Sequence, residues 1–138
     1  MTFLLDTNVI SELRRPERAS PAVINWVRAQ TEGSLWCSVV AILELEIGAL
    51  RTLRRDELQG TMLRTWIDGQ VLPRFEGRVV PIDLSVALKC ASLHVPNPLP
   101  DRDAYIAATA LVHDLTVVTR NVRDFAATGA RVLNPWAS

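Results

Sequence analysis

Cysteine, lysine and long apolar segments are scarce in this sequence. Its 138 residues include two cysteines, Cys37 and Cys90, which form neither a CxxC pair nor a Cys/His zinc spacing, so we expect two reduced core thiols. No apolar run approaches the roughly 20 residues that a membrane helix needs, and Asp6 interrupts the start before a signal peptide could form. We therefore expect a cytoplasmic protein with no membrane association.

An excess of either charge is also absent, because 15 basic residues balance 15 acidic ones. Net charge therefore neither favours nor excludes a nucleic-acid partner. Lys89 is the only lysine, and every other basic residue is an arginine. Arginine binds phosphate through a bidentate fork, but a coding bias toward arginine explains the same composition.

Short apolar runs alternate with helical patterns along the chain. We expect strands at residues 2–5, 35–38, 79–82, 116–119 and 131–134. We expect helices from 7 to near 16, from 21 onward, and at 39–53, 54–75, 84–94 and 103–113, with a proline-rich connection at 95–101. Continuous apolar strands separated by helices are typical of a parallel sheet covered on both faces. The length favours one domain, so we predict a single α/β domain over residues 1–138, a three-layer α/β/α sandwich with a mainly parallel central sheet.

Two acidic residues lie where two of the predicted strands end. Asp6 follows the first strand directly, and Asp124 lies just beyond the fourth. Ligands of parallel sheets bind outside the carboxyl ends of the strands. Each acid also has an ordinary structural role open to it: Asp6 could cap a helix, and Asp124 could hold a turn together with Asn121. Haloacid-dehalogenase phosphatases begin similarly, but they need a second Asp where this chain has Asn8.

Glu44 and Glu46 lie in a predicted helix that is apolar nearly all round. An unpaired buried carboxylate costs several kcal/mol, so each needs a metal ion or an arginine as its partner. Periodicity does not choose between them, although small residues one turn from Glu44 favour it slightly as the site residue.

Asp101 and Asp103 lie near the start of the alanine-rich helix, where either could cap it or complement its dipole. Asp103 has Ile106 and Ala107 one turn ahead and so projects from the inward face. Asp101 adjoins the proline-rich connection and is the better candidate for the cap.

Carboxylates gathered in one place repel one another unless a cation neutralises them. Hard oxygen ligands suit Mg²⁺, with Mn²⁺ as a substitute. Zinc would need histidine or cysteine ligands, and neither His94 nor His113 has the spacing of a zinc site.

The ordered set of motifs resembles the PIN-domain family, and in particular its VapC-type toxins of the FitB-like branch. The motifs are LLDTNVISEL at the start, SVVAILELEIG, DAYIAA, VVTRNVRDF and the ending NPW, and together they span residues 4–136. Each motif is weak alone, but their order and spacing make the set specific.

The resemblance implies which residues form the site. The catalytic and metal-binding acids that match the family motifs are Asp6, Glu44, Asp103 and Asp124. Leu43 departs from the family, which usually has a small residue before the glutamate, and Asp101 is an additional acid near the site. Supporting or RNA-contacting positions would be Thr7, Asn8, Thr119, Asn121, Arg120 and Arg123.

The resemblance also implies an activity and partners. It implies the toxin of a type II toxin–antitoxin system, an endoribonuclease that hydrolyses RNA phosphodiester bonds with a metal-activated water. A VapB-type antitoxin would cover the acidic groove, the toxin would form a homodimer, and operator DNA would be bound only through the antitoxin. Two alternatives stay open, a hydrolase of small phosphate esters and a non-catalytic module that binds RNA or protein. The sequence does not identify the RNA target.

Overall fold

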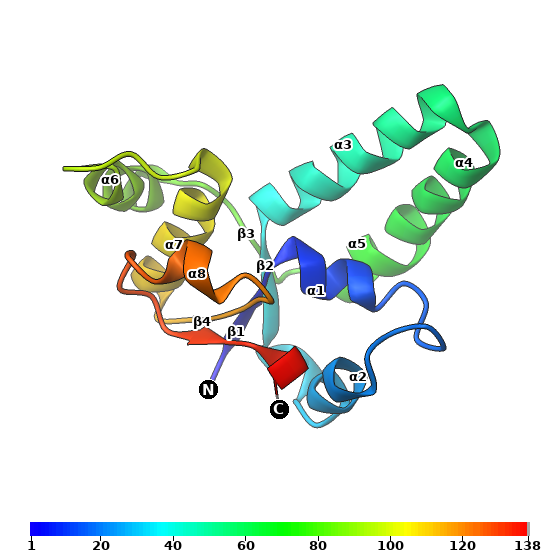
Figure 1. The fold of residues 1–138 in the computed structure, drawn as a ribbon, viewed down its shortest axis with the longest axis horizontal. Helices are drawn as coiled ribbons and strands as arrows, with labels where there is room; N and C mark the ends of the chain where they lie inside the picture. Colours follow the sequence, from blue (N-terminus) through cyan, green and yellow to red (C-terminus); the bar gives the residue numbers. More distant parts are fainter. Residues whose placement is uncertain (138) are drawn as a thin grey trace.

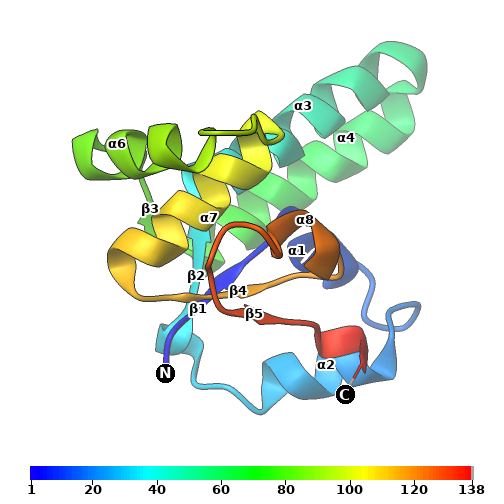
Figure 2. The same cartoon turned by 60° about the vertical axis from the view of Figure 1, so that its left-hand side comes forward.

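The computed structural model describes residues 1–137, whose centre is a parallel sheet of five short strands (Figures 1 and 2). The strands are β1 (Phe3–Leu5), β2 (Leu35–Ser38), β3 (Val79–Val80), β4 (Thr116–Val118) and β5 (Val132–Leu133), in the order β3-β2-β1-β4-β5. Every pairing among them is parallel, which confirms the predicted sheet. Strand β3 is shorter than predicted because Pro81 follows it, and proline has no N–H to donate to a neighbouring strand.

Successive residues of the central strands enter opposite cores, as the twofold period of a strand requires. Phe3 and Leu5 belong to one buried cluster, and Leu4 between them belongs to another. Both faces of β1 are therefore covered by helices, which is why its sequence is apolar without interruption.

The first face is covered by helices from the first half of the chain. These are α1 (Thr7–Glu12), α2 (Pro21–Arg28), α3 (Val39–Arg55) and α4 (Glu57–Trp66), followed by a π-helical turn (Ile67–Val71) and α5 (Leu72–Arg74). A short 3₁₀ turn (Glu32–Ser34) precedes β2. In both views α3 and α4 form a hairpin that projects away from the sheet (Figures 1 and 2).

The α3–α4 hairpin has two local causes. Asp56 interrupts the helix, and its Oδ1 accepts a hydrogen bond of 3.1 Å from the Gln59 amide, which caps α4. Gly60 then lets the two helices approach closely, because a Cβ at this position would overlap the backbone of Leu53. These two features together produce the close hairpin.

The second face is covered by helices from the second half of the chain. They are α6 (Leu84–Leu93), α7 (Asp101–His113) and α8 (Val122–Phe125), and a 3₁₀ turn (Pro135–Ala137) follows β5. Helices α6 and α7 pack on each other through a smaller cluster that includes Cys90. Cys37 and Cys90 are both buried free thiols, as expected. No helix within residues 1–137 is both long enough and apolar enough to cross a membrane.

Helix α7 begins two residues earlier than predicted. Pro100 occupies the cap position, and Asp101 is already in the first helical turn, so the prediction that Asp101 caps this helix is wrong. Its side chain is 85% exposed and lies 3.8 Å from Nε2 of His94. Asp101 therefore faces α6 and the solvent.

The strand order creates a switch point between β1 and β4. From β1 the chain proceeds to β2 and β3 on one side, and it then crosses to β4 and β5 on the other. The carboxyl ends of β1 and β4 are adjacent, since Leu5 pairs with Val118. Such a point is where open α/β sheets bind ligands.

Candidate active site

Asp6 lies at the switch point, directly after β1, and only 6% of its surface is exposed. Its Oδ1 accepts a hydrogen bond of 2.8 Å from the Thr7 amide, so it does cap α1. Its Oδ2 accepts a second bond of 2.8 Å from Oγ1 of Thr119. Burial raises the pKa of Asp6 above its ordinary value; the two hydrogen bonds oppose this rise, and the charge of Asp124 adds to it.

Thr119 connects the ends of β1 and β4 through one fully buried hydroxyl group. While donating to Asp6, its Oγ1 accepts hydrogen bonds from Nδ2 of Asn8 at 3.2 Å and from the amide of Asn121 at 3.0 Å. The Oδ1 of Asn8 in turn accepts from the Arg120 amide at 3.4 Å. Four of the predicted supporting residues thus form one network behind Asp6.

Glu44 and Glu46 have different environments although two positions on α3 separate them. The Oε1 of Glu44 accepts a hydrogen bond of 3.3 Å from Thr7, and burial followed by the charge of Asp6 raises its pKa. Glu46 points to α4, where its two oxygens lie 2.6 and 2.9 Å from the guanidinium of Arg64. Only Glu44 therefore belongs to the group around Asp6, and Glu46 has the arginine partner that its position requires.

Asp103 and Asp124 complete the acidic group from the other side of the switch point. Asp103 lies in the first turn of α7, half-buried, and Asp124 lies on α8 with its side chain exposed. The pKa of Asp103 is raised to about 6, chiefly by burial and then by the charges of Asp6, Asp124 and Glu44. Figure 1 shows α1, α3, α7 and α8 around this edge of the sheet.

The charges of these four acids act on one another, but the four side chains do not form a compact set of metal ligands. Within residues 1–137, no three acidic, histidine or cysteine side chains already have a geometry that could hold an ion. Like charges favour such separation. The pKa values of Asp6, Glu44 and Asp103 are raised chiefly by burial, and repulsion by neighbouring acids adds to each rise. An all-oxygen donor set under repulsion fits a hard divalent cation such as Mg²⁺ or Mn²⁺.

The arginines near the site have different surroundings. Arg120 lies over the ring of Trp136, with its guanidinium carbon 5.2 Å from the ring centroid, and Arg123 is exposed on α8. Sequence reasoning missed Arg102, whose Nη1 lies 3.9 Å from Oε2 of Glu44. Its position immediately before Asp103 was a sequence hint that it lies near the site. Neighbouring helix residues point about 100° apart, however, so adjacency alone did not reveal the approach of Arg102 to Glu44.

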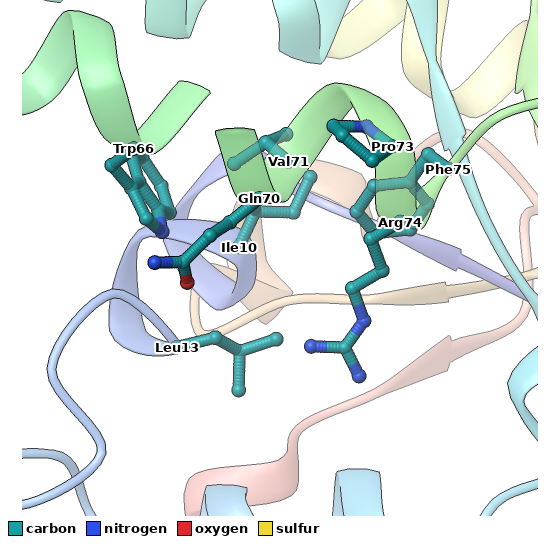
Figure 3. Close-up of a pocket in the computed structure, with 8 residues that line it drawn as sticks. All are labelled: Ile10, Leu13, Trp66, Gln70, Val71, Pro73, Arg74 and Phe75. Carbon is teal, nitrogen blue, oxygen red and sulfur yellow. The ribbon is translucent and has the colours of Figure 1, made fainter. Parts of the chain in front are cut away.

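A separate cavity of about 450 Å³ lies away from the acids, between α1 and the segment from α4 to α5 (Figure 3). Its lining is mostly apolar and includes Leu13, Trp66 and Phe75, with Gln70 and Arg74 as polar members. No acidic residue lines this cavity, so it offers no carboxylate ligand for a cation.

Comparisons with known proteins agree with this architecture. The family model described as "PIN domain" matches residues 3–130. The chain is 37% identical to "VapC ribonuclease Y4jK" of Sinorhizobium fredii, covering 97% of each chain. It is 35% identical to "Toxin FitB" of Neisseria gonorrhoeae, covering 97% of this chain and 98% of that protein. The solved structure of FitAB bound to an IR36 DNA fragment superposes with a TM-score of 0.88 at 33% identity, covering 98% of this chain and 96% of that one.

Proposed function

The chain belongs to the PIN-domain family, and from that premise we propose that it is the toxin of a type II toxin–antitoxin pair and cleaves RNA with the help of a divalent cation. The observation that carries the proposal is the convergence of Asp6, Glu44, Asp103 and Asp124 on the switch point of the sheet. The relative named a VapC ribonuclease supports the choice of substrate. We extend the proposal to a single PIN domain over residues 1–138 and to action in the cytoplasm, where RNA is available.

The four acids would hold the cation, Mg²⁺ or in its place Mn²⁺. When bound, such an ion polarises a phosphodiester and lowers the pKa of a water molecule. The protein's own hydrogen bonds hold the acids in position. Thr119 and the Thr7 amide fix the two oxygens of Asp6. The Thr7 hydroxyl orients Glu44 from the same turn. Thr7 of α1 and Thr119, the residue after β4, therefore set the geometry of Asp6 and Glu44 before any ligand arrives.

RNA would approach along the exposed rim of the site. Asp124 and Arg123 are exposed on α8, and Arg102 borders Glu44 from α7. Arginine donors bind phosphate, whereas the acids exclude it unless a cation is present. This arrangement supports a reaction in which the substrate phosphate is admitted only to the metal-loaded site.

The proposed partners follow from the family. We propose a VapB-type antitoxin that covers the acids, a toxin homodimer, and binding of operator DNA only through the antitoxin. The solved FitAB structure with bound DNA supports the last of these. Several large apolar side chains are exposed, among them Leu58 at 70% and Leu84 at 74%. They would be covered in such an assembly.

The proposal is tested by offering purified, antitoxin-free protein three substrates in Mg²⁺, in Mn²⁺ and in EDTA. They are a mixed single-stranded RNA pool, the same sequences as DNA, and p-nitrophenyl phosphate. We expect RNA to be cleaved in either metal and not in EDTA, and cleavage to be lost in Asp6→Asn and Asp103→Asn. Preference for the small ester would indicate a different phosphohydrolase, and binding of RNA without cleavage would indicate a non-catalytic module.

A further inference from the structure

Arg102 reaches the acidic group from the first turn of α7. Its Nη1 lies 3.9 Å from Oε2 of Glu44, which is beyond hydrogen-bonding distance. Its side chain is 49% exposed. The guanidinium is thus held near Glu44 by charge and faces the solvent as well.

Two other arginines of this protein have guanidinium groups that are engaged in structural contacts. Arg64 forms a bidentate pair with Glu46, and Arg120 lies over Trp136. Within residues 1–137, the guanidinium of Arg102 donates no hydrogen bond to any protein atom. Its donors therefore remain available to a ligand at the edge of the site.

The charge of Arg102 also acts on the acid that it approaches. At 3.9 Å its positive charge partly neutralises the Glu44 carboxylate. A divalent cation bound by the same acids would repel the guanidinium and take over its role as the neutralising charge. The donors of Arg102 would then be available to a phosphate group beside the metal site.

This inference rests on the proposed function. We propose that Arg102 is a phosphate-binding residue for RNA, held beside Glu44 until a divalent cation replaces it there. Arg102 thereby links the binding of metal to the binding of RNA. It competes with the metal for the Glu44 carboxylate, and it binds an RNA phosphate once the metal is bound.

The test measures the binding of Mn²⁺ and of RNA to the Arg102→Gln variant. The matched control is Arg51→Gln, because Arg51 is an exposed arginine on α3. Calorimetry with Mn²⁺ should show that Arg102→Gln binds the ion about 2–5-fold more tightly, since a competing charge is gone. Fluorescence anisotropy with a short phosphorothioate RNA in Mg²⁺ should show weaker binding. The slope of log affinity against log salt should also fall by about 0.7, the value for one lost phosphate contact. Arg51→Gln should match the wild type in both measurements.

Opposite changes for metal and RNA are the signature, because a purely structural residue would weaken both. Weaker binding of both ligands, or no change in either, overturns the inference. Should Arg102→Gln fail to fold, Arg102→Lys decides: it should retain wild-type affinity for Mn²⁺ and show intermediate affinity for RNA, and equal loss of both overturns the inference. Absence of RNA cleavage by the wild type overturns the proposed function and this inference with it. Cleavage by the wild type, with Arg102→Gln indistinguishable from Arg51→Gln, overturns this inference alone.

Discussion

Thr119, the residue after β4, donates a hydrogen bond of 2.8 Å to Oδ2 of Asp6, the residue after β1. The two residues are 113 positions apart in sequence, and the parallel pairing of Leu5 with Val118 brings them together. Both side chains are buried, so the bond stabilises an acid in a place where an isolated carboxylate would be costly. The contact links the fold of the sheet to the geometry of the site.

We predict that Thr119→Val destabilises the protein by about 1–3 kcal/mol, because it leaves buried polar partners unsatisfied. The pKa of Asp6 should rise further, since the hydrogen bond that lowers it is lost. Urea denaturation gives the stability, and titration of the Asp6 carboxyl by NMR gives the pKa. Thr119→Ser retains the hydroxyl and should keep the pKa of Asp6 near the wild-type value; a rise as large as in the valine variant would show that the hydroxyl is not responsible.

Asp103 makes the stability of the metal-free protein depend on pH. Its pKa is raised from the ordinary 3.8 to about 6, so the folded state binds a proton more tightly than the unfolded state does. In EDTA, the stabilisation that comes from this tighter proton binding is fully present below about pH 4 and is lost as the pH rises through about 6.

We therefore predict that Asp103→Asn stabilises the metal-free protein at pH 7. Full conversion of the pKa shift would give about 3 kcal/mol. Partial exposure and the loss of a favourable helix-dipole contact reduce the expected gain to about 1 kcal/mol. The free energy of unfolding in urea should show this gain at pH 7 and little of it at pH 4, and Mg²⁺ should stabilise the wild type more than the variant. A variant less stable than the wild type at pH 7 would contradict the raised pKa.

Gly60 provides a test of the hairpin that is independent of the site. Gly60→Ala should cost about 2–4 kcal/mol, because the added Cβ would overlap the backbone of Leu53. Gly48 is the matched control: it also lies in a helix, and a Cβ there meets no atom within 4 Å. Gly48→Ala should stabilise by up to about 1 kcal/mol through helix propensity. Equal effects in thermal denaturation would mean that α3 and α4 do not approach as described.

Much of the sheet was predictable because its strands are buried on both faces. The uninterrupted apolar runs at β1, β2 and β4 are the direct sequence signature of that burial. Helix α3 follows β2 at once, and Ser38 caps it, as its Oγ accepts a 3.0 Å hydrogen bond from the Val40 amide. The start of α7 was missed because Asp101 and Asp103 are both suited to a first turn, and Pro100 decides between them. Helix boundaries depend on such local details more than on the hydrophobic period.

The site was predictable in part for a similar reason. Asp6 follows from its position after β1, but the choice between Glu44 and Glu46 needs the hairpin, since Arg64 on α4 is the partner that draws Glu46 away. Arg102 was missed, because its approach to Glu44 depends on how α7 meets α3. Contacts between helices distant in the chain leave no trace in a local pattern.

The measurement that tests the central claim most directly compares Glu44→Gln with Glu46→Gln, two identical changes on one helix. RNA cleavage in Mg²⁺ and calorimetric binding of Mn²⁺ would be measured on both variants and on the wild type. We predict that Glu44→Gln loses at least about 100-fold in cleavage and binds Mn²⁺ more weakly, since second-sphere and ligand changes commonly cost this much. Glu46→Gln should retain both properties and lose only the stability, about 0.5–1 kcal/mol, of a partly exposed pair with Arg64. Equal activity in the two variants, or loss in Glu46→Gln alone, would contradict the assignment of the carboxylate site.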